Sequence, residues 1–80
     1  MAKRLTVNMQ AVLSELWRHA DESGKVEVYQ DAIGRALNVP RSTVSRAVAV
    51  LEARDYLVYL SKGARNTKGQ YRMKGKRHDV

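Results

Sequence analysis

The sequence predicts a small α+β domain with the element order α-β-α-α-β-β. Three segments repeat apolar residues at helical spacing, which indicates amphipathic helices. Short segments with strand-like alternation or with aromatic and β-branched residues lie between the first two helices and after the third. The 80 residues, 44% of them hydrophobic, suffice for one globular domain with a modest core. We assign residues 1–73 to this domain and residues 74–80 to a flexible basic C-terminal tail.

The first helix is expected at residues 7–21, where six apolar residues recur at helical spacing. A short side-chain oxygen can accept a backbone N–H at a helix start, so Thr6 or Asn8 is the expected cap. Gly24 breaks the pattern after the helix. Residues 25–29 alternate between polar and apolar side chains, which predicts a small strand that leads into the second helix.

Two further helices follow this strand. The second is short, at residues 30–38, and ends at Asn38, a residue that tolerates the left-handed backbone conformation found at helix C-termini. The third starts near Pro40 or Arg41, because proline suits the first turn of a helix, and it runs to about Arg54. Its apolar stripe consists of Val44, Ala47, Val48 and Leu51.

The last part of the domain has the pattern of a β-hairpin. Residues 56–60 are aromatic and β-branched, and residues 70–73 alternate so that Tyr71 and Met73 share one face. The intervening residues 61–69 are rich in turn formers and in positive charge. The sequence therefore predicts two strands joined by a basic loop.

The positive charge of the chain is concentrated near its C-terminal end. The net charge is +7 overall, but residues 1–60 hold eight basic and seven acidic side chains, a net charge of only +1. The remaining 20 residues hold seven basic side chains and one acidic one. Such a basic region is typical of proteins that bind a polyanion, although anionic membranes and acidic proteins also attract it.

Several kinds of chemistry find no support in the sequence. There is no cysteine, so disulfides and thiolate metal sites are excluded. We see no phosphate-binding glycine-rich loop, no nucleophile–base pair and no metal-ligand spacing, and His19 and His78 lie far apart in the chain. We therefore expect no enzyme activity, no cofactor and no small-molecule ligand. No stretch resembles a signal peptide or a membrane span, and we expect a cytoplasmic protein.

Residues 30–49 have the pattern of two helices that cross steeply at a short turn. Such a crossing needs a small residue where the helices touch, a turn residue that tolerates a positive φ, and apolar residues that lock the pair. Gly34 is the small residue and Asn38 is the turn residue. The locking residues are Ile33, Leu37, Val39, Val44 and Ala47.

Residues 33–47, IGRALNVPRSTVSRA, closely resemble the helix-turn-helix of bacterial winged-helix transcriptional regulators such as the MarR and GntR superfamilies. Residues 51–57, LEARDYL, look like the end of their recognition helix and the entry to the wing, and the resemblance extends over about residues 6–73. Tyr29 stands where the family often has a Ser or Thr cap, and Asp55 stands where it often has glycine. The resemblance implies a winged-helix fold, duplex DNA as the partner and transcriptional regulation as the activity.

The recognition helix should place long side chains in the major groove, where an arginine can pair with guanine through two hydrogen bonds. The residues expected to contact bases are Arg41, Ser42, Ser45 and Arg46. An arginine at the tip of the wing can enter a narrow minor groove, and Arg65 is our candidate. The residues expected on the DNA backbone are Thr43, Lys62, Lys68, Arg72 and Lys74, with Lys76 and Arg77 of the tail. The resemblance adds a phosphate contact from the start of the second helix, at Tyr29 and Gln30.

The leading hypothesis is therefore a sequence-specific transcriptional regulator that acts on nucleoid DNA. The sequence leaves other functions open. One is a replication, partition or excision factor of a plasmid or phage, and another is a winged-helix module for protein–protein contact. A basic module that binds RNA or a membrane surface is a third. A homodimer, or an oligomer assembled on DNA, is plausible because two half-sites add affinity. Helix 1 and Val50 are the candidate contact surfaces.

Overall fold

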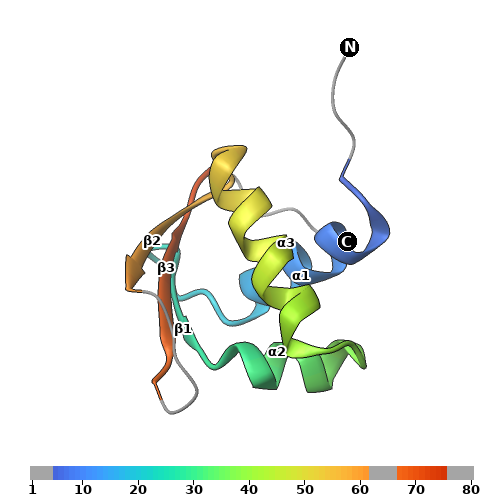
Figure 1. Ribbon diagram of the computed structural model, residues 1–80. Coiled ribbons are helices and arrows are strands. Elements are labelled where there is room, and N and C mark those ends of the chain that lie inside the picture. The colour runs from blue at the N-terminus through green and yellow to red at the C-terminus, as the bar shows by residue number, and fades with distance from the viewer. Residues whose placement is uncertain (1–4, 62–66, 76–80) are drawn as a thin grey trace.

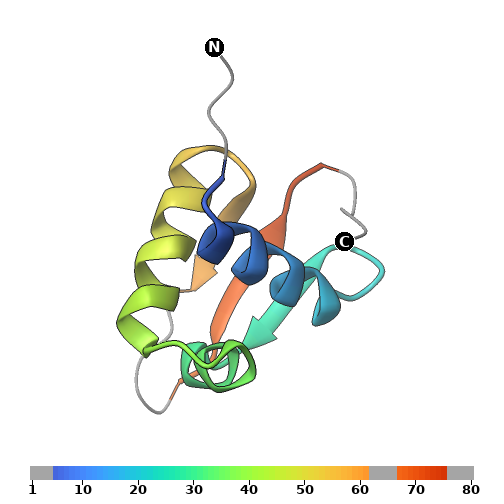
Figure 2. The ribbon, with the colours of Figure 1, turned by 90° about the vertical axis from the view of Figure 1, so that its right-hand side faces the viewer.

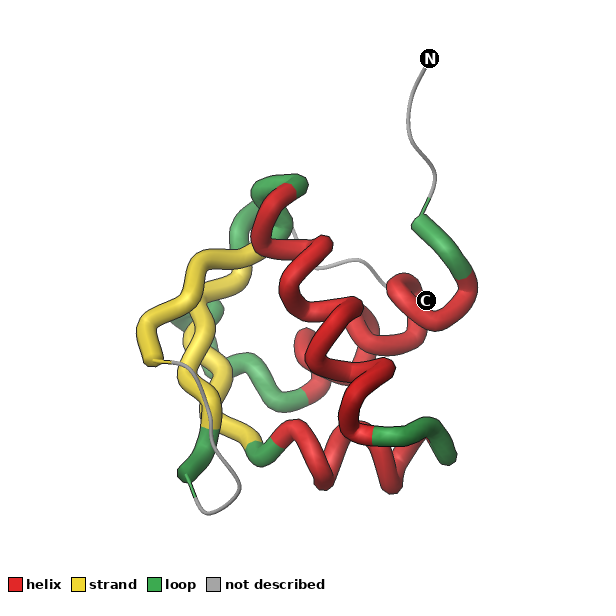
Figure 3. Tube along the Cα trace, viewed as in Figure 1, coloured by secondary structure: helices red, strands yellow, loops and turns green. Residues whose placement is uncertain are grey.

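The computed structural model describes residues 5–61 and 67–75, and it has the expected order of elements (Figure 1). The helices are α1 (Val7–Arg18), α2 (Gln30–Leu37) and α3 (Arg41–Ala53). The strands are β1 (Lys25–Val28), β2 (Leu57–Ser61) and β3 (Gly69–Met73). The helices form one layer and the strands the other, as Figure 3 shows. The predicted α+β class is confirmed.

The three strands form one antiparallel sheet in the order β1-β3-β2. Strands β2 and β3 pair as the predicted hairpin, with Leu57 opposite Met73 and a register shift between Tyr59 and Ser61. The sequence did not reveal a partner for β1, and the structure provides one: Val26 lies opposite Tyr71 of β3. The central strand β3 thereby connects the hairpin to the segment that leads into α2.

The core lies between the sheet and the helical layer, which is seen from the helical side in Figure 2. All four residues of the predicted α3 stripe are at most 5% exposed, and Trp17 of α1 is buried in the same core. The sheet contributes alternate residues, because side chains of a strand point to opposite faces. The core consists of Val12, Leu13, Leu16, Trp17, Val26, Val28, Ile33, Val44, Ala47, Val48, Leu51, Leu57, Tyr71 and Met73.

The residues predicted to start and end the helices have the expected roles. Thr6 caps α1, since its Oγ1 accepts a hydrogen bond from the backbone N–H of Met9 at 3.2 Å. Asn38 ends α2 with φ 59°, and the backbone N–H of Val39 returns to the carbonyl of Gly34 at 2.9 Å. Asp55 adopts a similar left-handed conformation after α3, with φ 69°. Helices α2 and α3 end within one residue of the predicted positions.

The predicted end of α1 at residue 21 is wrong, because the helix stops at Arg18. Asp21 uses its side chain to build a turn instead: its Oδ1 accepts the backbone N–H of Ser23 at 2.9 Å and that of Lys25 at 3.0 Å. Aspartate side chains compete in this way with the hydrogen bonds of a helix. The pKa of Asp21 is lowered, mainly by the hydrogen bond from the Ser23 hydroxyl.

Gly34 is required where α2 meets α3. A Cβ atom on Gly34 would lie 2.7 Å from the carbonyl oxygen of Val39 and 3.6 Å from the backbone nitrogen of Arg41. The first distance is shorter than a normal van der Waals contact, and the oxygen belongs to the main chain of the turn. The predicted role of Gly34 as the small residue of the crossing is confirmed.

Candidate nucleic-acid interface

The outer face of α3 is the first part of the candidate site. Opposite the buried stripe, the side chains of five residues are exposed to solvent: Arg41, Ser42, Ser45, Arg46 and Ala49. The helix lies at one side of the molecule, where the sheet does not cover it (Figure 2). The four predicted base-contacting residues therefore lie on one accessible helix face, and their contact with bases stays a prediction.

Thr43 and Arg46 lie on the flank of α3 that faces the start of α1. Together with Asn8 and Met9 they line a shallow groove, to which Val50 also contributes. Thr43 is half-buried, whereas Arg46 is exposed. The flank thus presents a hydroxyl and a guanidinium beside the exposed first turn of α1.

Arg41 lies beside an acidic residue that the sequence did not single out. Its Nε atom lies 3.7 Å from Oδ1 of Asp31 in the first turn of α2, and the two side chains are 42% and 43% exposed. Both residues line an open cleft of about 670 Å³ at the helix crossing, together with Gly34, Arg35 and the turn. One signal was available: Asp31 precedes Gly34 by three residues and so lies on the helix face that meets α3.

Gln30 points toward the interior. Its Nε2 donates a hydrogen bond of 3.0 Å to the hydroxyl of Tyr71, which is fully buried on β3. Burial raises the pKa of Tyr71, while the bond from Gln30 and the charge of Arg41 lower it. The predicted phosphate contact at Gln30 would therefore use its backbone N–H and not its side chain.

Tyr29 and Lys68 connect the start of α2 to the base of the hairpin loop. Tyr29 is 39% exposed, so its ring is not part of the core, and its hydroxyl does not cap the helix. Nζ of Lys68 lies 5.7 Å from the centre of the ring, within the range of a cation–π interaction. The two predicted backbone-contacting residues thus lie side by side.

The other predicted cations of the hairpin are distributed differently. Arg72 is exposed between the buried residues Tyr71 and Met73, so it projects from the sheet face opposite the helices. Lys74 forms an ion pair with Asp55. The structure therefore does not bring these two cations together with the exposed face of α3. Four further predicted cations lie outside the described residues: Lys62, Arg65, Lys76 and Arg77.

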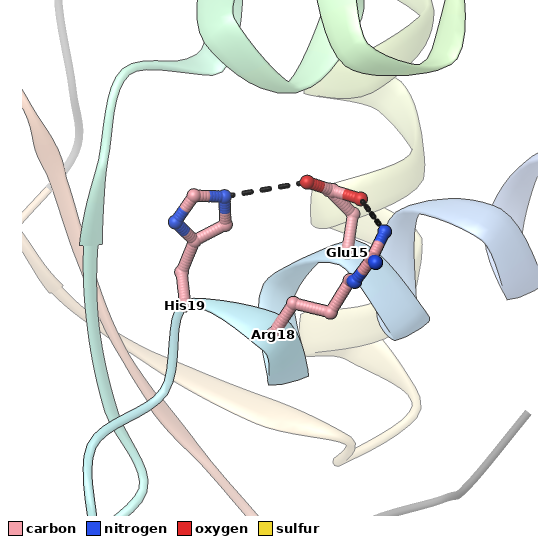
Figure 4. A network of polar contacts seen from close by, with 3 residues as sticks. All are labelled: Glu15, Arg18 and His19. Carbon is pink, nitrogen blue, oxygen red and sulfur yellow. Dashed lines mark hydrogen bonds and ion pairs between the residues drawn. The ribbon is translucent and has the colours of Figure 1, made fainter.

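The polar network at the end of α1 has the features of a surface cluster. Nε2 of His19 lies 3.3 Å from Glu15 Oε2, and Nη1 of Arg18 lies 3.5 Å from Glu15 Oε1 (Figure 4). Glu15 and Arg18 belong to the last turns of α1 and His19 is its C-cap, and pairs at this spacing stabilise by only a few tenths of a kcal/mol, about 0.2–0.5. Within residues 5–61 and 67–75, no group of three or more His, Cys, Asp or Glu side chains is placed to hold a metal ion.

None of the described helices has the length and apolar character needed to cross a membrane. A family model described as the MarR family matches residues 11–65 of the chain. The described part of this span runs from α1 through the helix crossing to the end of β2. Neither a curated protein nor a solved structure matches the chain.

Proposed function

The chain belongs to the MarR family of winged-helix, DNA-binding transcription regulators, and we propose that it recognises a specific sequence of duplex DNA. One observation carries this proposal: the exposed polar face of α3 lies opposite a fully buried stripe. A helix with one face locked into the core presents the other face in a fixed orientation, which base recognition needs. We place this activity on nucleoid DNA in the cytoplasm.

In the proposed complex, α3 enters the major groove, which is about 12 Å wide and accepts a helix. Arg46 makes no ion pair within the described part of the chain, so its guanidinium is available to pair with O6 and N7 of guanine. Ser42 and Ser45 lie on the same exposed face and have hydroxyls that both donate and accept hydrogen bonds. They suit contacts to base edges or to nearby phosphates.

The DNA backbone would be held on both sides of α3. Lys68 and the first backbone N–H groups of α2 lie on the hairpin side, because Lys68 rests on Tyr29 at the start of that helix. Thr43 lies on the other flank, beside α1. Lys62 and Arg65, which lie outside the described residues, stay proposed contacts to the DNA backbone and the minor groove. Lys74 and Arg72 are weaker candidates, since one is paired with Asp55 and the other projects from the far face of the sheet.

Selection of bound sites from random duplex DNA tests this proposal, with Arg46→Ala as the variant and Lys25→Ala as its control. Lys25 is an exposed cation of β1, distant in the fold from the face of α3, so both variants lose one positive charge. We expect one enriched motif for the wild type and the control, and an altered motif for Arg46→Ala. Retention of DNA without an enriched motif would contradict sequence-specific recognition. Absence of any DNA binding at low salt would favour a protein–protein module.

The same selection reports on oligomeric state. A protein that binds as a dimer enriches a palindrome whose half-sites are about one helical turn apart, whereas a monomer enriches one half-site. We propose a dimer or a DNA-assisted oligomer, and the exposed residues of α1 with the half-buried Val50 are the candidate contact. A motif without symmetry would contradict the dimer.

A further inference from the structure

The environment of Arg41 differs from that of Arg46, although both arginines lie on the exposed face of α3. Arg41 has a carboxylate beside it, since Asp31 Oδ1 lies 3.7 Å from its Nε. Arg46 has no acidic partner within residues 5–61 and 67–75. Before any DNA is bound, the guanidinium of Arg41 therefore has an acidic neighbour and that of Arg46 does not.

The carboxylate of Asp31 approaches the guanidinium at its inner nitrogen, Nε. An arginine carries five N–H donors in a planar fork, one on Nε and four on the two terminal nitrogens. Asp31 lies on the Nε side, which leaves the terminal nitrogens for another acceptor. Guanine offers two acceptors on its major-groove edge, O6 and N7, at the spacing of that fork.

The first turn of α2 also has a polar contact on the interior side, at Gln30. The charge of Arg41 acts on the hydroxyl of Tyr71, which is buried and receives a hydrogen bond from Gln30 at 3.0 Å. Gln30 and Asp31 are consecutive residues of the first turn of α2. This turn therefore places a carboxylate beside the guanidinium and an amide on the tyrosine hydroxyl.

We propose that Asp31 is a positioning residue for base recognition: without touching DNA, it holds the Arg41 guanidinium so that its terminal nitrogens meet one base pair. The proposal rests on the sequence-specific DNA binding proposed above. A fixed guanidinium loses less conformational freedom on binding and tolerates a displaced base less well. A carboxylate near the DNA backbone also repels phosphate, so Asp31 lowers affinity for all DNA while it raises preference at one position.

The test compares the wild type with Asp31→Asn, Asp31→Glu, Arg41→Ala and the double variant Asp31→Asn/Arg41→Ala. The dissociation constant is measured for the selected site and for the set of sites in which each base pair is replaced in turn, at one salt concentration. Glu22→Gln is the charge-matched control, because Glu22 is an exposed acidic residue of the loop before β1. Thermal unfolding of each variant shows that it is folded at the assay temperature.

We expect Arg41→Ala to abolish preference at one base pair. Asp31→Asn should reduce preference at that same base pair about two- to fivefold, the size typical of an exposed ion pair, and leave the other positions unchanged. Asp31→Glu should restore the preference at that base pair, and Glu22→Gln should leave it unchanged. The double variant should show the same base preference as Arg41→Ala. A role confined to stabilising α2 would change the melting temperature without changing preference at one position.

Three results would overturn the inference. The first is an unchanged profile of base preference for Asp31→Asn, and the second is an equal loss of preference at all positions. The third is a further loss of preference when Asp31→Asn is added to Arg41→Ala. Each of these leaves sequence-specific binding by the wild type intact. The proposed function fails differently, through a wild type that selects no motif, and this result would overturn both proposals. The two failures are therefore distinguishable within one set of measurements.

Discussion

Replacement of Gly69 by alanine should destabilise the fold through a single contact at the start of β3. A Cβ atom on Gly69 would lie 2.2 Å from the hydroxyl oxygen of Tyr71 and 2.7 Å from its Cζ. The backbone of Gly69 does not have the positive φ that would strain an alanine. Where alanine fits without strain, it stabilises a protein by about 0.4–1 kcal/mol through the unfolded chain. Any net loss therefore reports the collision with Tyr71.

The tyrosine cannot move aside at low cost. Its side chain is fully buried, it packs on Tyr59 with 5.7 Å between ring centres, and its hydroxyl is bonded to Gln30 at 3.0 Å. Overpacking a core costs about 1–3 kcal/mol, and the hydrogen bond contributes about 1 kcal/mol. After subtraction of the alanine gain, Gly69→Ala should lower the free energy of unfolding by about 1–3 kcal/mol. For a domain of this size, each kcal/mol lowers the melting temperature by roughly 4–8 °C.

A double-mutant cycle isolates the contact. Tyr71→Phe removes the oxygen nearest to the new Cβ, at a cost of about 0.5–1.5 kcal/mol for the lost hydrogen bond. Gly69→Ala should therefore cost about 1 kcal/mol less in the Tyr71→Phe background than in the wild type. Circular dichroism with urea as denaturant measures all four proteins. Additive effects, or a Gly69→Ala variant as stable as the wild type, would refute the steric reasoning.

Three further predictions concern binding and pH. Arg46→Ala should relax base preference at one position and cost about 1–3 kcal/mol of binding free energy if the arginine pairs with guanine, as measured by titration of the selected DNA. Lys68→Ala should weaken all sequences about equally and reduce the slope of log K against log salt by about one; a loss confined to certain sequences would contradict the wing assignment. Burial raises the pKa of Tyr71 above the ordinary value of 10.0, so the stability that its neutral form contributes is complete below pH 10 and is lost as the pH rises through the folded-state value. Urea unfolding between pH 8 and 11 should show this loss for the wild type and a smaller loss for Tyr71→Phe, with the remainder due to Tyr59, whose pKa burial also raises.

Features that depend on neighbours along the chain could be predicted from the sequence. The buried stripe of α3 follows from helical periodicity alone, and the left-handed Asn38 follows from the preference of that residue for helix ends. Gly34 was predictable because the crossing of two short-linked helices demands a small residue. In each case one local rule decides the outcome, and the surrounding structure agrees with it.

Features that depend on two distant elements could not be predicted in the same way. The pairing of Gln30 with Tyr71 joins residues 41 positions apart, and it depends on the register of β3 against β1. The contact between Asp31 and Arg41 depends on the angle at which α2 meets α3. The early end of α1 has another cause. Apolar periodicity predicts which face of the helix is buried, but it does not show that the Asp21 side chain binds backbone N–H groups after the helix.

The junction around Tyr71 determines which variants can separate DNA binding from stability. Arg46 is exposed and makes no ion pair in the described part of the chain, so its replacement should leave the melting temperature unchanged. Gln30 and Gly69 are different, because both act on the tyrosine that joins β3 to the first turn of α2. Their replacement should move the hairpin base relative to α3 and weaken binding even well below the melting temperature. A Gln30→Ala variant that loses stability but binds DNA like the wild type would show that the core and the proposed interface are independent at this point.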